Sequence, residues 1–147
     1  MPRYRRGFDL ELAEAHLRRR DRKLARWMAR IGPIGPEPRW RQRFDPVDAL
    51  ARAILYQQLS GKAAATIVGR VEAAIGSARL HADTLSRCDD ARLRACGVSG
   101  NKLLALRDLS RREALGEIPG TAQMARMDEA AIIDALVPVR GIGRWTV

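Results

Sequence analysis

The sequence has few of the residues on which several classes of protein depend. It contains two cysteines, Cys88 and Cys96, and two histidines, His16 and His81, among 147 residues. Two cysteines do not make the disulfide framework of a small secreted protein, and we expect both to be buried as small apolar residues. No run of eighteen apolar residues is present, and residues 1–6 lack the apolar region of a signal peptide. These absences predict a cytoplasmic, reducing compartment and no membrane span.

Lysine is also scarce, since only Lys23, Lys62 and Lys102 occur among 27 basic residues. The formal net charge of +10 points to a polyanionic partner. However, 13 basic and 6 acidic side chains lie within the first 45 residues, so most of the excess is concentrated there. Such an arginine excess is also typical of a genome-composition effect. The charge alone therefore gives mild support for nucleic-acid binding.

Strand-like alternation, tandem repeats and low-complexity tracts are absent from the sequence. Apolar residues instead recur at helical spacing between capping residues, which predicts an all-α fold of about seven helices. A break rich in glycine and proline, residues 32–38, leads us to expect a basic N-terminal helical segment, 1–44, and a second segment, 45–147. The predicted helices span residues 10–20, 22–31, 46–57, 61–75, 90–96, 100–112 and 129–137.

Local signals mark where these helices begin and end. A serine or aspartate precedes several of them and predicts an N-cap, while a glycine follows two of them and predicts a left-handed end. We expect His16 to be a solvated surface residue and His81 to lie in a loop. The predicted N-caps are Asp9, Ser60, Asp89, Ser99 and Asp128, and the predicted end glycines are Gly76 and Gly97.

The C-terminal stretch carries the strongest functional signal of the residues themselves. Pro138 ends the helix over 129–137, and Gly141 and Gly143 allow a tight turn that a ligand can approach closely. Residues 144–147 predict the opening turn of a further helix, whose first N–H groups lack partners inside the helix. Free amides on a glycine turn at a helix N-terminus favour an anion, usually a phosphate.

Residues 136–146 read Leu-Val-Pro-Val-Arg-Gly-Ile-Gly-Arg-Trp-Thr. This stretch closely resembles the helix-hairpin-helix of the base-excision DNA glycosylases, and its Arg-Trp-Thr is similar to the 3-methyladenine DNA glycosylase II branch. The resemblance covers about residues 15–147 and implies a multi-helix orthogonal bundle that contains a helix-hairpin-helix motif. It also implies a structural Na⁺ or K⁺ on the main-chain carbonyls of Val137, Val139 and Ile142, and no other cofactor. The implied DNA-backbone contacts are Gly141, Ile142, Gly143, Arg144 and Thr146.

Residues 53–64, Ala-Ile-Leu-Tyr-Gln-Gln-Leu-Ser-Gly-Lys-Ala-Ala, resemble the same family. Taken alone, residues 56–60 predict no more than a polar corner between two helices. By the resemblance this corner faces the minor groove, and Gln58 fills the gap that an extruded base leaves. Extrusion costs a few kcal/mol, and an inserted side chain recovers part of it. Leu59 is the alternative intercalating residue, and Tyr56 departs from the family, which usually has glycine there.

A third stretch, residues 93–102, also resembles the family and ends in Lys102. The residues themselves favour a role for Ser99 and Lys102 at the start of a helix. A contact between Lys102 and a DNA phosphate is the alternative that the resemblance adds.

Trp145 bears on the chemistry that the resemblance implies. Bifunctional relatives have a lysine there, whose amine forms a Schiff base with the sugar before strand cleavage. Tryptophan cannot do this, but its ring can stack on a cationic alkylated purine, so monofunctional hydrolysis is favoured. The alternative is that Trp145 belongs to the core of the hairpin.

The family's catalytic aspartate lies roughly twenty residues past the hairpin turn, which places it beyond Val147. We therefore expect a chain that is C-terminally incomplete and inactive by itself. Asp134 is predicted to face solvent and Asp128 to cap a helix, so neither replaces that aspartate.

The resemblance thus implies a base-excision repair glycosylase that flips alkylated purines out of duplex DNA and removes them by hydrolysis. We expect a monomer whose partner is double-stranded DNA. A non-catalytic helix-hairpin-helix module that binds duplex phosphates is one alternative, and a purely structural arginine-rich helical domain is another.

Overall fold

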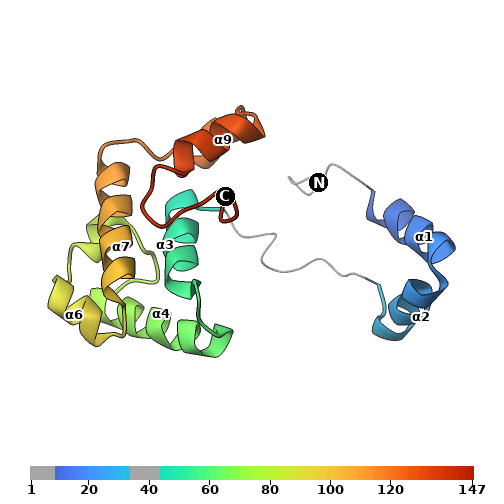
Figure 1. The fold of residues 1–147 in the computed structure, drawn as a ribbon, viewed down its shortest axis with the longest axis horizontal. Helices are drawn as coiled ribbons and strands as arrows, with labels where there is room; N and C mark the ends of the chain where they lie inside the picture. Colours follow the sequence, from blue (N-terminus) through green and yellow to red (C-terminus); the bar gives the residue numbers. More distant parts are fainter. Residues whose placement is uncertain (1–8, 34–43) are drawn as a thin grey trace. The chain divides into compact units, whose positions relative to one another are not determined.

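The computed structural model describes residues 9–33 and 44–147, and each regular element in these ranges is a helix (Figure 1). The chain forms two compact units, Met1–Gln42 and Arg43–Val147, and each is described here by itself. The all-α prediction is confirmed. Within the described ranges, no helix combines the length and the apolar character needed to cross a membrane.

The first unit contains α1 (Leu10–Arg20) and α2 (Arg22–Ile31), which have the predicted bounds. Asp9 caps α1 through the N–H of Leu12 at 3.1 Å. Asp21 ends α1 and begins α2, because its carboxylate accepts the N–H groups of Lys23 and Leu24 at 2.8 and 3.0 Å. His16 is exposed, as predicted. Neither helix has a fully buried residue.

Five of the helices in the second unit were predicted, and two short ones were not. Four-residue helices are too short to show a periodic pattern, which is why no helix was predicted at α5 and α8. The helices are α3 (Pro46–Tyr56), α4 (Gly61–Ile75), α5 (Ala82–Leu85), α6 (Asp90–Ala95), α7 (Gly100–Ala114), α8 (Thr121–Met124) and α9 (Glu129–Leu136).

The predicted caps are present. Each of the four predicted N-cap side chains in this unit accepts a hydrogen bond from the main-chain N–H three residues later, at 2.8 to 3.5 Å. Gly76 ends α4 with a left-handed φ of 65°. These caps fix where the helices begin and therefore where the corners between them lie. The four residues are Ser60, Asp89, Ser99 and Asp128.

The core of the second unit lies between α3, α4 and α7. In Figure 1, α3 and α7 lie side by side and α4 lies across the end of α3, which gives the orthogonal arrangement that was predicted. Cys88 and Cys96 are buried and unpaired, and their thiols donate to the carbonyls of Ala74 and Arg70. Fully buried apolar side chains of this core are Ile54, Leu55, Val71, Leu80, Leu85, Leu93, Leu106, Leu109 and Val139.

Long-range polar contacts join these helices at positions that no local signal marked. Arg52 on α3 donates to Asp48 at 2.7 Å, to Glu72 on α4 at 2.8 Å and to the carbonyl of Ala78 at 2.7 Å. His81 lies outside the helices, as predicted for a loop residue, but its burial was not predicted. It is the N-cap of α5 and only 7% exposed, because two carboxylates from distant segments take up both ring nitrogens.

Candidate nucleic-acid interface

The corner between α3 and α4 is a tight turn with an unusual residue at its second central position. The N–H of Leu59 donates to the carbonyl of Tyr56 at 3.3 Å, which closes the turn over Gln57 and Gln58. Gln57 has φ −52° and ψ 134°, and Gln58 has a φ of 56°. These angles are those of a type II turn, where glycine or asparagine normally occupies the position of Gln58.

Gln58 is the only non-glycine residue with positive φ among residues 9–33 and 44–147. A left-handed conformation costs a residue with a side chain about 1–2 kcal/mol. Strain of this kind persists only where the surrounding structure holds it, and it is frequent at functional sites. Gln58 and Leu59, the two predicted intercalating residues, are both exposed on this turn.

The hairpin after α9 is anchored by two buried apolar side chains. Val139 and Ile142 are 1% and 5% exposed, and the N–H of Ile142 donates to the carbonyl of Val139 at 3.0 Å. Gly141 lies between them with a φ of 79°, which a residue with a Cβ adopts only with strain. The turn therefore needs a glycine at position 141.

Gly143 is different, because the fold does not require it. Its φ lies outside the left-handed region, and an added Cβ would meet no atom within 4 Å. The tight turn therefore depends on the backbone conformation of Gly141 and not on that of Gly143. At Gly143 the missing side chain leaves open space beside the backbone, as close approach of a ligand requires.

Asp108 on α7 anchors the hairpin through a hydrogen bond to its main chain. Its Oδ2 accepts the main-chain N–H of Arg140 at 2.9 Å, and its carboxylate also accepts from Arg111 and Arg112 at 2.9 and 3.0 Å. Burial opposes ionisation of Asp108, but these three hydrogen bonds outweigh it and lower the pKa to about 2. Sequence analysis missed this residue, because 32 positions separate it from Arg140.

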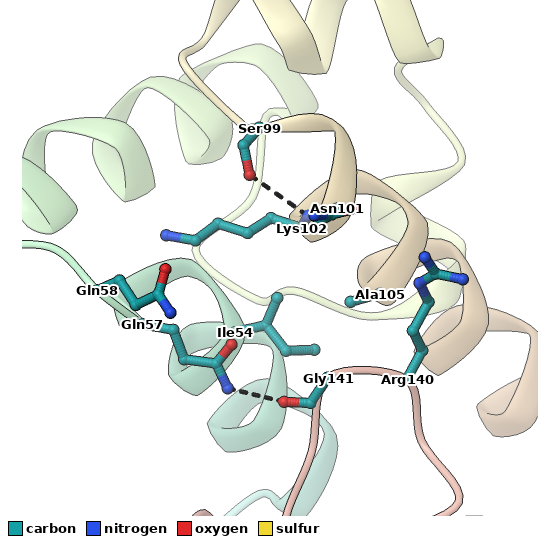
Figure 2. A pocket seen from close by; sticks show the side chains of 9 residues that line it. All are labelled: Ile54, Gln57, Gln58, Ser99, Asn101, Lys102, Ala105, Arg140 and Gly141. Carbon is teal, nitrogen blue, oxygen red and sulfur yellow. Dashed lines mark hydrogen bonds between the residues drawn. The ribbon is translucent and has the colours of Figure 1, made fainter.

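The corner and the hairpin meet at one cleft of about 480 Å³ (Figure 2). The Nε2 of Gln57 donates to the carbonyl of Gly141 at 2.9 Å, and the first turn of α7 forms the third side of the cleft. The three stretches that the sequence singled out are therefore adjacent in the structure. The cleft is lined by Ile54, Gln57, Gln58, Ser99, Asn101, Lys102, Ala105, Arg140 and Gly141.

Residues 51–146 match the family model of the HhH-GPD superfamily of base excision DNA repair proteins. The chain belongs to this superfamily. DNA-3-methyladenine glycosylase 1 of Schizosaccharomyces pombe is 31% identical over 140 residues, which cover 95% of this chain and 61% of that protein. An alkylbase DNA glycosidase-like protein of the same yeast is 24% identical over 143 residues, covering 95% of this chain and 65% of that protein.

Two solved structures have the same fold. The S. pombe 3-methyladenine DNA glycosylase in complex with abasic DNA superposes with a TM-score of 0.78 at 31% identity, covering 91% of this chain and 65% of that one. A DNA-3-methyladenine glycosidase from Bacillus halodurans gives a TM-score of 0.72 at 28% identity, covering 97% of this chain and 64% of that one. The resemblance is thus confirmed, and the chain spans a little under two thirds of these relatives' length.

Lys102 makes a side-chain contact with the main chain of α3. Its Nζ donates to the carbonyl of Leu55 near the end of α3 at 2.7 Å, and burial lowers its pKa. The lysine therefore satisfies a helix-end carbonyl directly behind the corner. An ammonium has three N–H donors, so a phosphate contact by Lys102 remains a prediction beside this structural role.

The segment after Gly143 folds into a single turn. Residues 144–146, where the opening turn of a helix was predicted, form a hydrogen-bonded turn that closes from the N–H of Thr146 to the carbonyl of Gly143 at 2.8 Å. Trp145 is 101% exposed, so it takes no part in a core formed by the described residues. Its exposed ring leaves stacking on a base as the prediction to test.

The remaining predicted backbone contacts are not equally well placed. The N–H groups of Ile142 and Thr146 are already used inside their turns. Thr146 also lines a separate apolar groove, together with Leu50 and Leu136, rather than the cleft. Gly141, Gly143 and the exposed Arg144 are thus better placed than Ile142 and Thr146 for the predicted contacts with the DNA backbone.

The carboxylates have the surroundings that were predicted. Asp128 caps α9, and Asp134 is exposed on that helix. No aspartate or glutamate among the described residues lines the cleft. In the same ranges, no group of three or more His, Cys, Asp or Glu side chains is placed to hold a metal ion. A cation at the hairpin would therefore depend on main-chain carbonyls, of which that of Val139 already accepts one hydrogen bond.

Proposed function

We propose that this chain is part of a DNA glycosylase that flips alkylated purines out of duplex DNA and removes them hydrolytically in base excision repair. The observation that carries the proposal is the meeting of two features at one cleft. An exposed glutamine held in a left-handed conformation lies beside a glycine hairpin whose backbone is open to a phosphate. The names of the relatives give the substrate class, and one of their structures holds abasic DNA.

The hairpin grips the DNA backbone. Main-chain N–H groups at Gly141 and Gly143 donate to a phosphate, and the guanidinium of Arg144 adds a charged contact. Such contacts position the protein on any duplex without reading its sequence. A Na⁺ or K⁺ held by the carbonyls of Val137, Val139 and Ile142 would bring positive charge to the same phosphate.

The corner acts on the base stack. Gln58 enters the space that the extruded base leaves, and its amide replaces part of the lost pairing with the partner base. Leu59 is the alternative intercalating residue. Trp145 offers an exposed ring on which the flipped, positively charged purine stacks.

Hydrolysis needs a carboxylate beside C1′ to stabilise the oxocarbenium-like sugar. Since no described carboxylate lines the cleft, we propose that it comes from beyond Val147, as the family resemblance implies. We also propose that the protein acts as a monomer on double-stranded DNA and works in the cytoplasm, with the nucleoid in a bacterial cell.

The test compares methylated and undamaged duplexes with the complete protein that the gene encodes. Release of methylated purines, and tighter binding to abasic than to intact duplex, are the expected results. Binding to both duplexes without any base release would instead support the non-catalytic helix-hairpin-helix module. If the protein showed no salt-dependent binding of duplex DNA, the alternative of a purely structural helical domain would be supported.

A further inference from the structure

We propose that Gln57 is a positioning residue that couples the hairpin to the corner between α3 and α4. The position of the phosphate bound by the hairpin then determines where Gln58 enters the duplex. The inference rests on the proposed function and deepens it, because it assigns a role to a residue that does not itself enter the DNA. Figure 2 shows the contact on which it depends.

Gln57 is fixed at both ends. Its main-chain N–H donates to the carbonyl of Ala53 at 3.1 Å, which keeps it on the last turn of α3. Its side-chain Nε2 donates to the carbonyl of Gly141 at 2.9 Å, across 84 positions of sequence. The side chain is partly buried in this contact. One residue therefore ties the end of α3 to the glycine that shapes the hairpin.

Gln58, the next residue, has a backbone conformation that neighbouring contacts must stabilise. Gln58 occupies the position of the turn that favours glycine, and the strain of its left-handed backbone has to be offset by neighbouring contacts. Lys102 holds Leu55, one turn earlier on α3. Of these two supports, the Gln57 bond is the one that reaches the hairpin, so it transmits the position of a bound phosphate to Gln58.

The amide is chemically specific for this task. A carbonyl oxygen needs a donor, and the glutamine side chain presents an N–H to Gly141. A glutamate at position 57 has nearly the same shape but faces the carbonyl with acceptors only. Gln57→Glu therefore breaks the coupling with little change of volume, and Gln57→Ala removes the bond altogether.

The experiment uses the intact protein and a duplex that carries an abasic site with 2-aminopurine opposite it. The fluorescence of 2-aminopurine rises when its stacking is disturbed, so the signal at saturating protein reports insertion at the gap. Binding of an undamaged duplex, measured by anisotropy, reports the contact between the hairpin and the phosphate separately from insertion at the gap. Thermal unfolding is measured for every variant. Gln123→Glu is the matched control, since Gln123 is exposed on α8 and lies outside the cleft.

We expect both Gln57 variants to weaken binding of the abasic duplex about three- to tenfold, the effect of one lost hydrogen bond. Most of the 2-aminopurine signal should be lost even at saturation, as in Gln58→Ala. In a Gln58→Ala background, Gln57→Ala should cause no further loss of signal, because Gln57 acts through its neighbour. The control should match the wild type in all three measurements.

Wild-type signal in Gln57→Glu at saturating protein would overturn the inference while leaving the proposed function intact. So would losses that simply multiply in the double variant. If Gln57→Ala lowers the unfolding temperature, the saturation signal of Gln57→Glu and of the double variant, taken below that temperature, still decides the matter. A wild-type protein that binds neither duplex would overturn the proposed function itself.

Discussion

The Nδ1 atom of His81 lies 2.5 Å from the Oε1 atom of Glu113, so the start of α5 is bound to the end of α7. The other ring nitrogen lies 2.8 Å from Oδ2 of Asp45, the N-cap of α3. Glu113 also accepts the N–H of Ala82 at 2.7 Å, and the guanidinium of Arg79 lies 3.2 Å from the ring. Each ring nitrogen donates to a carboxylate only while it carries a proton, so both bonds form together only in the charged imidazole.

Stability is therefore expected to depend on pH through His81. Burial lowers the pKa of this histidine, but the hydrogen bonds and charges of Glu113 and Asp45 outweigh it and raise the pKa above 6.5. A raised folded-state pKa gives stability that is fully present below the unfolded pKa and is lost as the pH rises through the folded one. Unfolding temperatures measured between pH 5 and pH 9 should therefore fall as the pH rises from the unfolded-state pKa of His81 through its folded-state pKa.

His81→Gln should lower stability by about 1–3 kcal/mol, because two partly buried carboxylates lose their charged partner. It should also remove most of the fall in stability above the unfolded pKa. His16→Gln is the control, since His16 is exposed on α1. The same pH profile in His81→Gln as in the wild type would contradict this account.

Gly143→Val tests whether the hairpin receives a phosphate. The φ of Gly143 is not left-handed and its Cβ would enter open space, so the substitution should leave the unfolding temperature nearly unchanged. Binding of any duplex should nevertheless weaken by about tenfold or more, because a branched side chain blocks the approach of phosphate regardless of sequence. Anisotropy titrations on two unrelated duplexes measure the effect.

Two further glycine variants separate fold from binding. Gly141→Ala should cost about 1–2 kcal/mol of stability, since its φ of 79° is left-handed. Gly69→Ala, on an exposed and open face of α4, should leave binding unchanged and raise stability by about 0.5–1 kcal/mol, because alanine favours a helix interior. Undiminished binding by Gly143→Val would show that the hairpin is structural.

Arg144→Ala tests the charged contact at the same site. Removal of one phosphate contact should reduce the slope of log affinity against log salt by about one. The measurement is a set of duplex titrations between low and moderate salt. Arg126→Ala, which removes an exposed arginine outside the cleft, serves as the control. Equal slopes for Arg144→Ala and the wild type would exclude a phosphate contact by this side chain.

Local signals carried most of the helix prediction. Ser60 and Asp128 cap their helices through an N–H only three residues away, so the information lies within one turn of sequence. The contacts that assemble the site are of another kind. Gln57 reaches Gly141 across 84 positions and Asp108 reaches Arg140 across 32, and no spacing rule relates such pairs.

The two glycines of the hairpin show a second limit. The sequence marks both as turn residues, but only the structure separates Gly141, which the fold requires, from Gly143, which it does not. The left-handed backbone of Gln58 was equally hidden, because propensity places glycine at that position of the turn. Gln58 lines the cleft, and Gly143 lies two residues after Gly141, which also lines it.

Monofunctional chemistry gives the next prediction. The complete protein should release methylated purines without nicking the strand, because Trp145 stands where a lysine amine would be needed for cleavage. A polypeptide of residues 1–147 should release none, because no described carboxylate lines the cleft. Base release and strand breaks are measured on the same treated duplex. Nicking by the complete protein, or base release by residues 1–147, would contradict these assignments.

The exposed ring of Trp145 should matter for the flipped base and not for the intact duplex. In the complete protein, Trp145→Ala should slow the release of cationic purines by about 3- to 30-fold, the range expected for one cation–π contact. Binding of undamaged duplex should stay within about twofold, because stacking acts only after extrusion. Gln58→Ala should instead slow release of every substrate alike, since it weakens extrusion itself.

Leu115→Ala is the control for Trp145→Ala, since it removes another exposed apolar side chain, away from the cleft. It should change neither the release of purines nor the binding of undamaged duplex. If Trp145→Ala slowed neutral and cationic purines equally, Trp145 would act on extrusion and the stacking role would be lost.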